Sequence, residues 1–392
     1  MIKPEQLEQL FKTIDERRRF TLGIPNTEGT DCPLTLLTPE GVSMLVSQGI
    51  EVKIEKGAGQ SIHYPDNRYS RSGAEISSRV ETLRCDVVLY AGRLTPDEAA
   101  LLKPHGVLLT LLLNLPLHAE TVQVLLNRRI TVMALDRIRD HRGLYPLADI
   151  LGEVSGRAAI TTATSFMADP IVGKGILLGG VAGVNPCEVT ILGTGMSALA
   201  AARSAIGLGG MVRLFDSDPY CLRTAMAELG PAVIGSALHP IVLGHALASA
   251  DIIIATRVSR RFAIDDSVLD SMKQGVIIID LDHHNGLSGT FPTLKCVDVT
   301  TAIAQKVEPS RNVCLINPVG TVPRTAAMAL TNDIVPVIDR IFGSGRGLMN
   351  VLKTDGGLRA STVLFRGRVV NREIADRLSV KWIDINLLLS FS

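Results

Sequence analysis

Short apolar runs alternate with longer segments of helical periodicity along most of this 392-residue chain. The runs are rich in Val, Ile and Leu, which is typical of strands buried on both faces of a parallel sheet. We expect strands at residues 20–25, 50–54, 86–91, 107–113, 130–135, 187–192, 211–216, 233–234, 251–256 and 275–280. The helical segments between them indicate βαβ units, and therefore an α/β fold with helices on both faces of parallel sheets.

Some segments interrupt this alternation. Residues 4–19 have the spacing of an amphipathic leading helix, and residues 148–167 predict a long helix that bridges two domains. Thr38 is a suitable N-cap and Pro39 a suitable first residue for a helix that begins there. Near the C-terminus, residues 371–378 predict a further amphipathic helix that packs on the first domain.

The turn at residues 193–198 carries the most informative motif of the chain. It reads Gly-Thr-Gly-Met-Ser-Ala, the G-x-G-x-x-A form of the dinucleotide-binding fingerprint, and it follows an expected strand and opens an expected helix. Gly193 allows the tight turn, Gly195 lets the backbone approach a pyrophosphate, and Ala198 lets the helix pack close to the strand. The free N–H groups and the dipole of that helix favour an anion at its start.

An acidic residue completes the pattern. The next expected strand ends at Asp216, twenty-three residues after Gly193. Such a carboxylate accepts hydrogen bonds from the ribose hydroxyls of NAD and repels the 2′-phosphate of NADP. The alternative is a glycine turn in an α/β protein that binds no nucleotide. We favour the nucleotide site because turn, helix and acid occur together.

Composition narrows the class of protein. The length favours two domains, and 40 basic against 39 acidic residues leave no electrostatic signature of nucleic-acid binding. The six cysteines are scattered without a C-x-x-C pair, so we expect reduced thiols in a cytoplasmic protein and no metal site. The apolar run at 107–117 is too short to cross a bilayer, and we expect no membrane association.

A polar cluster follows the expected strand at 275–280. It contains Asp282, His283 and His284, and open α/β sheets bind ligands at the carboxyl ends of their strands. Two adjacent histidines cannot both face a cleft on an extended chain. The functional interpretation is an acid/base or cofactor contact from His284 or Asp282, and the alternative is a polar loop that covers the sheet.

Seven further motifs accompany the fingerprint, at residues 37–42, 56–59, 72–76, 153–157, 174–184, 322–325 and 329–332. With these motifs the chain, from about Leu22 to its end, resembles the alanine dehydrogenase and nicotinamide-nucleotide transhydrogenase alpha-subunit family. The resemblance implies two Rossmann-like, doubly wound domains. The substrate domain is formed by both chain ends, residues 1–148 and 318–392, and the NAD-binding domain, residues 149–317, is inserted between them.

The resemblance also implies an activity and its cofactor site. The family catalyses the reversible oxidative deamination of alanine to pyruvate with hydride transfer to NAD, and its members are oligomers, often hexamers. We therefore expect this chain to form a homo-oligomer, a dimer or a hexamer. Arg223 then lies near the adenosine and Asn317 at the nicotinamide end of the cleft. The cofactor-binding residues expected on this basis are Gly193, Gly195, Met196, Ala198, Asp216 and Arg223.

The substrate half departs from the family pattern. The departures are Leu34 for an arginine, Gly92 for a lysine, Leu113 or Asn114 for a histidine, His284 for an aspartate and, in the cofactor half, Gly152 for a serine. A 2-oxo acid needs cationic donors for its carboxylate, and deamination needs a group that titrates near neutral pH. Several losses together indicate a changed substrate or a lost reaction.

Two hypotheses of different classes follow. The first is an NAD-dependent dehydrogenase of the alanine dehydrogenase type that acts on another small L-amino acid or 2-oxo acid, with His284 as acid/base, Arg93 as carboxylate anchor and Asn317 at the nicotinamide. The second is a non-catalytic NAD(H)-binding relative that acts as a sensor or as an oligomer partner. A transhydrogenase half is a third, less favoured hypothesis.

Overall fold

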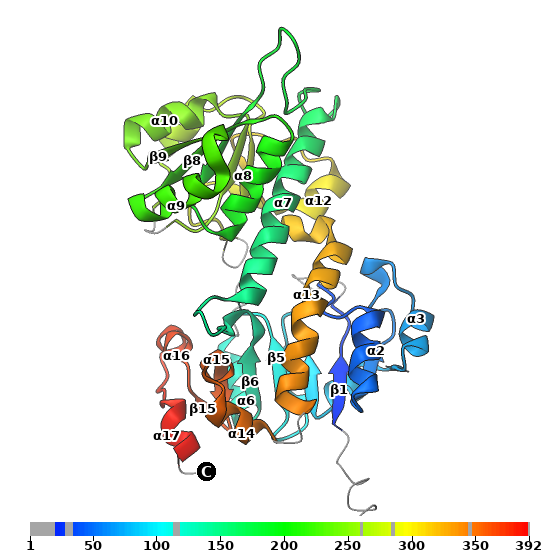
Figure 1. Cartoon of the computed structure of the whole chain (residues 1–392). Helices are drawn as coiled ribbons and strands as arrows, with labels where there is room; N and C mark the ends of the chain where they lie inside the picture. The colour runs from blue at the N-terminus through cyan, green and yellow to red at the C-terminus, as the bar shows by residue number, and fades with distance from the viewer. Residues whose placement is uncertain are drawn as a thin grey trace, which may run out of the picture. The chain divides into compact units, whose positions relative to one another are not determined.

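The computed structural model describes residues 20–27, 34–112, 118–258, 262–283, 287–343 and 347–390. They form two compact units, residues 1–147 with 327–392 and residues 148–326. Each unit is built on one sheet (Figure 1). The leading helix expected at 4–19 lies outside the described residues. In the described part no helix is long and apolar enough to span a bilayer.

The first unit contains an eight-stranded sheet in the order β15-β14-β6-β5-β4-β1-β2-β3. The strands are β1 (Thr21–Ile24), β2 (Glu51–Glu55), β3 (Glu75–Ser77), β4 (Val87–Leu89), β5 (Val107–Thr110), β6 (Thr131–Ala134), β14 (Thr362–Phe365) and β15 (Arg368–Val369). Strands β1 to β6 pair in parallel, whereas β14 pairs antiparallel to both β6 and β15. The expected parallel sheet is therefore extended at one edge by an antiparallel hairpin from the C-terminal segment.

Helices connect and cover these strands. They are α2 (Pro39–Ser47), α3 (Asp66–Arg71), α4 (Arg79–Leu83), α5 (Pro96–Leu101), α6 (Ala119–Asn127), α14 (Gly347–Thr354), α15 (Gly356–Ser361), α16 (Arg372–Leu378) and α17 (Ile385–Ser390). Helix α2 begins as predicted, with the Thr38 side chain accepting a hydrogen bond from the Gly41 N–H and with Pro39 at the first helical position. The core on one face of the sheet joins Val88, Leu108 and Val132 to α6 and α16.

The second unit contains a seven-stranded, all-parallel sheet in the order β12-β13-β11-β10-β7-β8-β9. The strands are β7 (Glu188–Leu192), β8 (Met211–Asp216), β9 (Val233–Ala237), β10 (Ile252–Ala255), β11 (Ile277–Asp280), β12 (Lys295–Asp298) and β13 (Val313–Ile316). The helices within the unit are α8 (Met196–Gly207), α9 (Pro219–Leu229), α10 (Pro240–Ser249), α11 (Asp266–Ser271) and α12 (Val299–Gln305).

Both faces of this second sheet are buried. Ile252 and Ile254 pack with residues of α8 and α9 on one face, while Ile253 and Ala255 pack with α10 and α11 on the other. Alternate residues of a strand point to opposite faces, so a continuous Ile run is what a doubly covered strand requires. The α/β fold with two sheets in which parallel pairing dominates is thus confirmed.

Two long helices belong partly to each unit. They are α7 (Pro146–Ala168), close to the long helix predicted at 148–167, and α13 (Pro323–Ile338). Pro336 lies inside α13, and the chain continues as a π-helical turn over Asp339–Gly343. Proline removes a backbone donor from the helical ladder, which accounts for the change of hydrogen-bonding pattern at this point.

Candidate active site

The turn after β7 has the conformation that the fingerprint predicts. Gly193 adopts φ +101°, and a Cβ there would lie 2.7 Å from the carbonyl oxygen of Arg257, so only glycine fits. Gly195 has an ordinary φ of −71° and is exposed, and no heavy atom of the described residues lies within 4 Å of the position of a Cβ. The first glycine therefore shapes the turn, while the second leaves space above it.

The start of α8 faces that space. Gly195 is the N-cap of α8 and supplies no side-chain acceptor for the first N–H groups, and Ala198 is fully buried. Two glycines of α7 bring that helix close: a Cβ on Gly156 would lie 2.9 Å from the Ala201 nitrogen, and one on Gly152 3.4 Å from the Ser197 nitrogen. Gly152, where the family has a serine, thus places no side-chain hydroxyl of α7 beside the first turn of α8.

This turn lies where an open sheet binds ligands. Strand β7 connects through α8 to β8 on one side, and its other neighbour is β10, so the order of the strands reverses between β7 and β10. Ligands of open α/β sheets bind outside the carboxyl ends of the strands at such a switch point. The Thr256 hydroxyl after β10 donates to Leu192 O at 2.8 Å and holds the two strand ends together.

Asp216 lies at the end of β8, beside the turn. Its Oδ2 accepts a hydrogen bond from the Thr194 hydroxyl at 2.8 Å, and its Oδ1 accepts one from the Asp218 N–H at 3.0 Å. The residue is only 2% exposed. These two contacts fix the orientation of the carboxylate at the end of β8.

The other expected cofactor residues lie on two helices of the second unit. Met196 is the first residue of α8 and is partly exposed, and Arg223 is exposed in the second turn of α9.

Strand β11 is followed by a turn with two acidic residues that are held by hydrogen bonds and an ion pair. Asp280 is fully buried, and it accepts hydrogen bonds from the Ser288 hydroxyl and, at 2.8 Å, from the Asp282 N–H. Burial raises the pKa of Asp280, although these two donors oppose the shift. Asp282 forms an ion pair of 2.9 Å with Arg257. His284, the predicted acid/base, lies outside the described residues.

Asn317 and His283 are brought together beside this turn. Asn317 ends β13 in the left-handed conformation, with φ +57°, and its Nδ2 donates to Asp298 Oδ2 at 3.0 Å. The amide orientation is thereby fixed, because a carboxylate only accepts. Asn317 Oδ1 then accepts from His283 Nε2 at 2.6 Å, so Nε2 carries the proton. His283 is 6% exposed, and its Nδ1 has no hydrogen-bond partner in the described structure.

The sequence interpretation overlooked this His283–Asn317–Asp298 chain. Its members come from the ends of three strands, β11, β13 and β12, and the last two of these strands were not expected. The adjacent histidines and the asparagine before a Pro-Val-Gly turn were both visible in the sequence. Only the order of the strands shows that the two positions meet.

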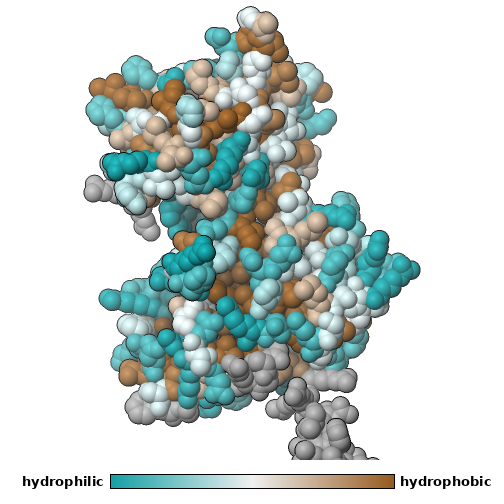
Figure 2. Space-filling model, in the orientation of Figure 1, coloured by the Kyte–Doolittle hydropathy of each residue, from teal (hydrophilic) through white to brown (hydrophobic). Residues whose placement is uncertain are grey.

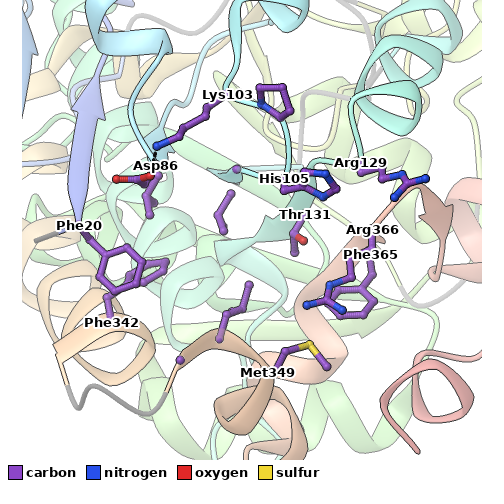
Figure 3. A pocket seen from close by; sticks show the side chains of 16 residues that line it. Phe20, Asp86, Lys103, His105, Arg129, Thr131, Phe342, Met349, Phe365 and Arg366 are labelled. Atoms are coloured by element: carbon purple, nitrogen blue, oxygen red, sulfur yellow. Dashed lines mark hydrogen bonds and ion pairs between the residues drawn. The ribbon is translucent and has the colours of Figure 1, made fainter. Parts of the chain in front are cut away.

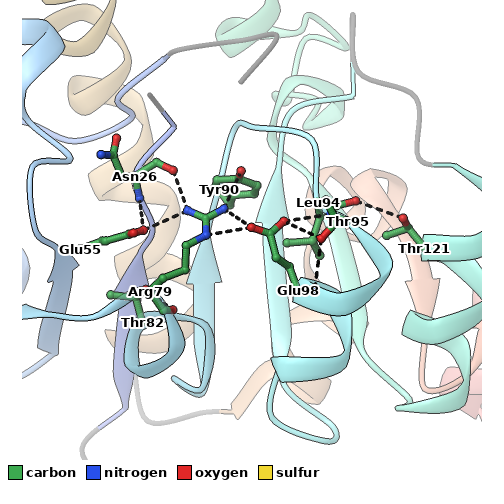
Figure 4. A network of polar contacts seen from close by, with 9 residues as sticks. All are labelled: Asn26, Glu55, Arg79, Thr82, Tyr90, Leu94, Thr95, Glu98 and Thr121. Carbon is green, nitrogen blue, oxygen red and sulfur yellow. Dashed lines mark hydrogen bonds and ion pairs between the residues drawn. The ribbon is translucent and has the colours of Figure 1, made fainter. Parts of the chain in front are cut away.

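A polar network occupies the carboxyl ends of β1, β2 and β4 in the first unit (Figure 4). Arg79, the first residue of α4, donates to Glu98 Oε1 through Nε at 2.8 Å and through Nη2 at 2.5 Å. It also donates to Glu55 Oε2 at 2.9 Å, to Asn26 O at 2.7 Å and to the Tyr90 hydroxyl at 3.0 Å. All five donors of the guanidinium are used, so Arg79 has none left for a substrate carboxylate.

Tyr90 covers the position of the family lysine. A Cβ on Gly92 would lie 2.5 Å from the Tyr90 hydroxyl oxygen and 2.6 Å from the ring carbon that bears it. A lysine at position 92 is therefore incompatible with this placement of the Tyr90 ring. Leu34, at the position of the family arginine, is buried. Arg93 follows β4 and is partly buried, whereas Leu113 and Asn114 lie outside the described residues.

Comparisons with known proteins cover nearly the whole chain. The family model "Alanine dehydrogenase/PNT, C-terminal domain" matches residues 159–372, and "Alanine dehydrogenase/PNT, N-terminal domain" matches residues 35–155. The alanine dehydrogenase of Bacillus subtilis (strain 168) is 30% identical over 370 residues, which are 92% of this chain and 96% of that protein. The alanine dehydrogenase of Mycolicibacterium smegmatis is 28% identical over 370 residues, 93% of this chain and 98% of that protein.

Solved structures show the same fold. An L-alanine dehydrogenase superposes with a TM-score of 0.78 at 26% identity, covering 91% of this chain and 98% of that one. A transhydrogenase from Sinorhizobium meliloti superposes with a TM-score of 0.69 at 18% identity, covering 89% of this chain and 99% of that one. The motifs, the fold and these matches agree, and the chain belongs to the alanine dehydrogenase/PNT family of oxidoreductases.

Proposed function

We propose that this protein is an NAD-dependent dehydrogenase that converts a small L-amino acid to its 2-oxo acid reversibly, with a substrate site that differs from that of alanine dehydrogenase. One observation carries the proposal. The open space over Gly195, the uncapped start of α8 and the oriented carboxylate of Asp216 lie together at the switch point of the second sheet.

The residues of the second unit fit a dinucleotide. The N–H groups at the start of α8 suit a diphosphate, and Asp216 suits the two ribose hydroxyls of NAD better than a 2′-phosphate. Asn317, held by His283 and Asp298, is a fixed amide for the nicotinamide end. When bound, NAD supplies the hydride acceptor, while the chain's residues bind, orient and move the proton.

Two residues are the candidates for the substrate chemistry, Arg93 in the first unit and His284 in the second. Because Arg79 is saturated and Leu34 is apolar, Arg93 is the candidate for binding the carboxylate of the substrate. His284 is the candidate for proton transfer at the amino or oxo group, since an imidazole titrates near neutral pH. The Tyr90 ring over Gly92 makes the site differ from one built around a lysine.

The accessory parts of the proposal are a homo-oligomer and a cytoplasmic location. Ile171, Leu177, Val181 and Val184 lie between α7 and β7 and are 58–76% exposed. Figure 2 shows brown side chains gathered on this loop. Such a group of exposed apolar residues suits a contact with a second copy. The five described cysteines are free thiols, which supports a reducing compartment.

Two measurements test the main proposal. Calorimetric titration with NADH measures binding, and NADH absorbance with ammonia and a panel of 2-oxo acids measures turnover. We expect NADH to bind and at least one oxo acid to react, and we expect His284→Ala to abolish turnover while NADH still binds. His141→Ala is the control, because His141 is exposed in a loop of the first unit. NADH binding without turnover of any oxo acid would instead identify a non-catalytic sensor. If NADH does not bind, both the dehydrogenase and the sensor hypotheses are rejected.

A further inference from the structure

A cavity of about 700 Å³ opens at the amino-terminal edge of the first sheet (Figure 3). Its walls include the first residues of β4, β5 and β6, namely Val87, Val107 and Thr131, and Phe365 at the end of the antiparallel β14. Its volume is in the range of small-molecule sites. The Arg79 network and Gly92 lie at the opposite, carboxyl edge of the same sheet, so the proposed reaction does not use this cavity.

One side of the cavity is apolar. The rings of Phe20 and Phe342 pack against each other with centroids 5.4 Å apart. Phe365 and Met349 contribute further apolar lining, and Phe365 is itself only 2% exposed. In Figure 3 the Phe20–Phe342 pair lies across the cavity from Phe365.

The other side is lined by basic residues. His105, Arg129 and Arg366 gather around Thr131 and Phe365 in Figure 3. The guanidinium of Arg366 lies over the Phe365 ring, 5.6 Å from its centroid.

The charges on this side differ in how they are balanced. Lys103, which also lines the cavity, forms an ion pair of 2.5 Å with Asp86. Arg129 and Arg366 have no carboxylate of a described residue within ion-pair distance. Arg129 and Arg366 are exposed residues that line the cavity, and no carboxylate of the described residues balances their charges.

The backbone at these three basic residues is unusual. His105, Arg129 and Arg366 all adopt positive φ, at 63°, 56° and 47°. This conformation costs an ordinary side chain about 1–2 kcal/mol and favours Gly or Asn. Arg366 and Gly367 form the two-residue loop between β14 and β15, where Asn-Gly is the preferred pair. Basic side chains thus occupy three turns at which uncharged residues would be more stable.

We propose that this cavity binds an organic anion with an apolar body, such as a medium-chain carboxylate. Arg129 and Arg366 bind the anionic group, since guanidinium pairs with carboxylate through two parallel hydrogen bonds. The chain of the ligand extends toward the Phe20–Phe342 pair, where each buried CH₂ contributes about 0.8 kcal/mol. Because the site lies at the amino-terminal edge of the sheet, opposite the carboxyl ends of the parallel strands, its ligand is an effector and not a substrate.

Octanoate is the probe ligand. Acetate, which lacks the apolar chain, and octanol, which lacks the carboxylate, are the two controls. Calorimetry in the presence of saturating NADH should show saturable octanoate binding at a one-to-one ratio, with both controls at least tenfold weaker. Methyl NMR of protein labelled with ¹³C-methionine locates the ligand. The Met349 signal, identified by Met349→Leu, should shift on addition of octanoate. Absence of saturable binding, equal binding of octanol, or binding that leaves the Met349 signal unchanged overturns the proposal.

A double variant removes the charges without straining the turns. Arg129→Asn with Arg366→Asn places at both positive-φ positions a residue that tolerates them, so the melting temperature should be unchanged or higher. Octanoate binding should weaken at least tenfold. Arg71→Asn with Arg84→Asn is the matched control, because these exposed arginines lie outside the cavity and change the net charge equally. Equal weakening in both double variants would indicate non-specific attraction and reject the site.

Discussion

The Thr194 hydroxyl donates to Asp216 Oδ2 at 2.8 Å, so the fingerprint turn itself orients the acidic residue at the end of the next strand. Turn and acid therefore form one unit before any ligand arrives. Since Asp218 N–H holds the second oxygen, the carboxylate has one defined orientation. Pre-orientation lowers the cost of binding a ribose.

Asp216→Asn should reduce the preference of the protein for NADH over NADPH. We expect the Kd for NADH to rise at least tenfold, because a charge-assisted hydrogen bond contributes about 1.5–3 kcal/mol, and the preference for NADH over NADPH to shrink. Thr194→Val is the control: it keeps the charge, should cost about 1 kcal/mol of stability, and should preserve the NADH/NADPH ratio. Parallel calorimetric titrations measure both, and an unchanged ratio in Asp216→Asn would remove Asp216 from the cofactor site.

Substitutions of the two glycines of the turn should have separate effects, one on stability and the other on NADH binding. Gly193→Ala introduces a side chain at φ +101° against the Arg257 carbonyl, so we expect about 2 kcal/mol or more of destabilisation. Gly195→Val meets open space, so the melting temperature should change little while NADH binding falls at least tenfold. Thermal unfolding and NADH titration of each variant provide the readouts. A Gly195→Val protein that binds NADH normally would contradict the proposed diphosphate position.

We expect the Asn317 side-chain amide to contribute to kcat and its left-handed backbone to determine which substitutions are stable. Asn317→Gly and Asn317→Ala both remove the contacts to His283 and Asp298, so kcat should fall about 10- to 100-fold in each. Only alanine is strained at φ +57°, and it should be less stable than the glycine variant by about 1 kcal/mol. Steady-state kinetics and urea unfolding separate the two effects. Full activity in Asn317→Gly would show that the amide has no role in the reaction.

Arg79→Met should destabilise the first unit. It leaves Glu55 and Glu98, with side chains 16% and 21% exposed, without their cation. Removing one partner of a fully buried pair costs about 3–5 kcal/mol, and for this partly exposed network we expect about 2 kcal/mol. Arg84→Met, at an exposed arginine, is the control in urea unfolding, and an equal effect of the two variants would show that the network is not stabilising.

The effect of Arg79→Met should depend on pH. Burial opposes ionisation of Glu98, but hydrogen bonds from Thr95 and Arg79 outweigh it and hold the pKa of Glu98 below its usual value. A lowered folded-state pKa stabilises the protein above the unfolded pKa of about 4.3, and this stabilisation is lost as the pH falls through the folded-state value. The stability difference between wild type and Arg79→Met should therefore be constant near neutrality and shrink below about pH 4.3.

The exposed apolar loop between α7 and β7 should control assembly. Leu177→Ser with Val184→Ser removes two side chains that are 69% and 63% exposed, so a homo-oligomer that uses this loop should dissociate to a smaller mass. Light scattering coupled to gel filtration measures the mass. Met44→Ser with Leu144→Ser, at exposed sites of the first unit, should leave it unchanged. If the loop variant keeps the wild-type mass, the assembly uses another surface.

The sequence predicted the local features well and the long-range ones poorly. The central strands, the Thr38 cap and the turn at 193–198 all depend on residues adjacent in the chain. Strand β12 reads Lys-Cys-Val-Asp, at the edge of its sheet, and was missed because it has no apolar run. Its partner β13 reads Val-Cys-Leu-Ile, an apolar run that the sequence interpretation overlooked.

The candidate site likewise combines local features that the sequence predicted with long-range contacts that it did not. The glycines and Asp216 form a contiguous motif with known spacing, and the turn has the expected geometry. The His283–Asn317–Asp298 chain and the Arg79 network each join several strand ends, so their contacts depend on strand order. Likewise, Gly92 marked a departure from the family, but only the structure shows Tyr90 over it.

The antiparallel pairing of β14 with β6 has a consequence for biosynthesis. Val132 pairs with Leu364, and the Thr38 N–H donates to Thr331 Oγ1 at 2.9 Å, so the first unit needs both ends of the chain. Residues 148–326, in contrast, leave the ribosome as one continuous segment and can fold during translation. Until the last part of the chain emerges, β6 has an unpaired edge, which exposes the nascent protein to aggregation and to chaperone capture.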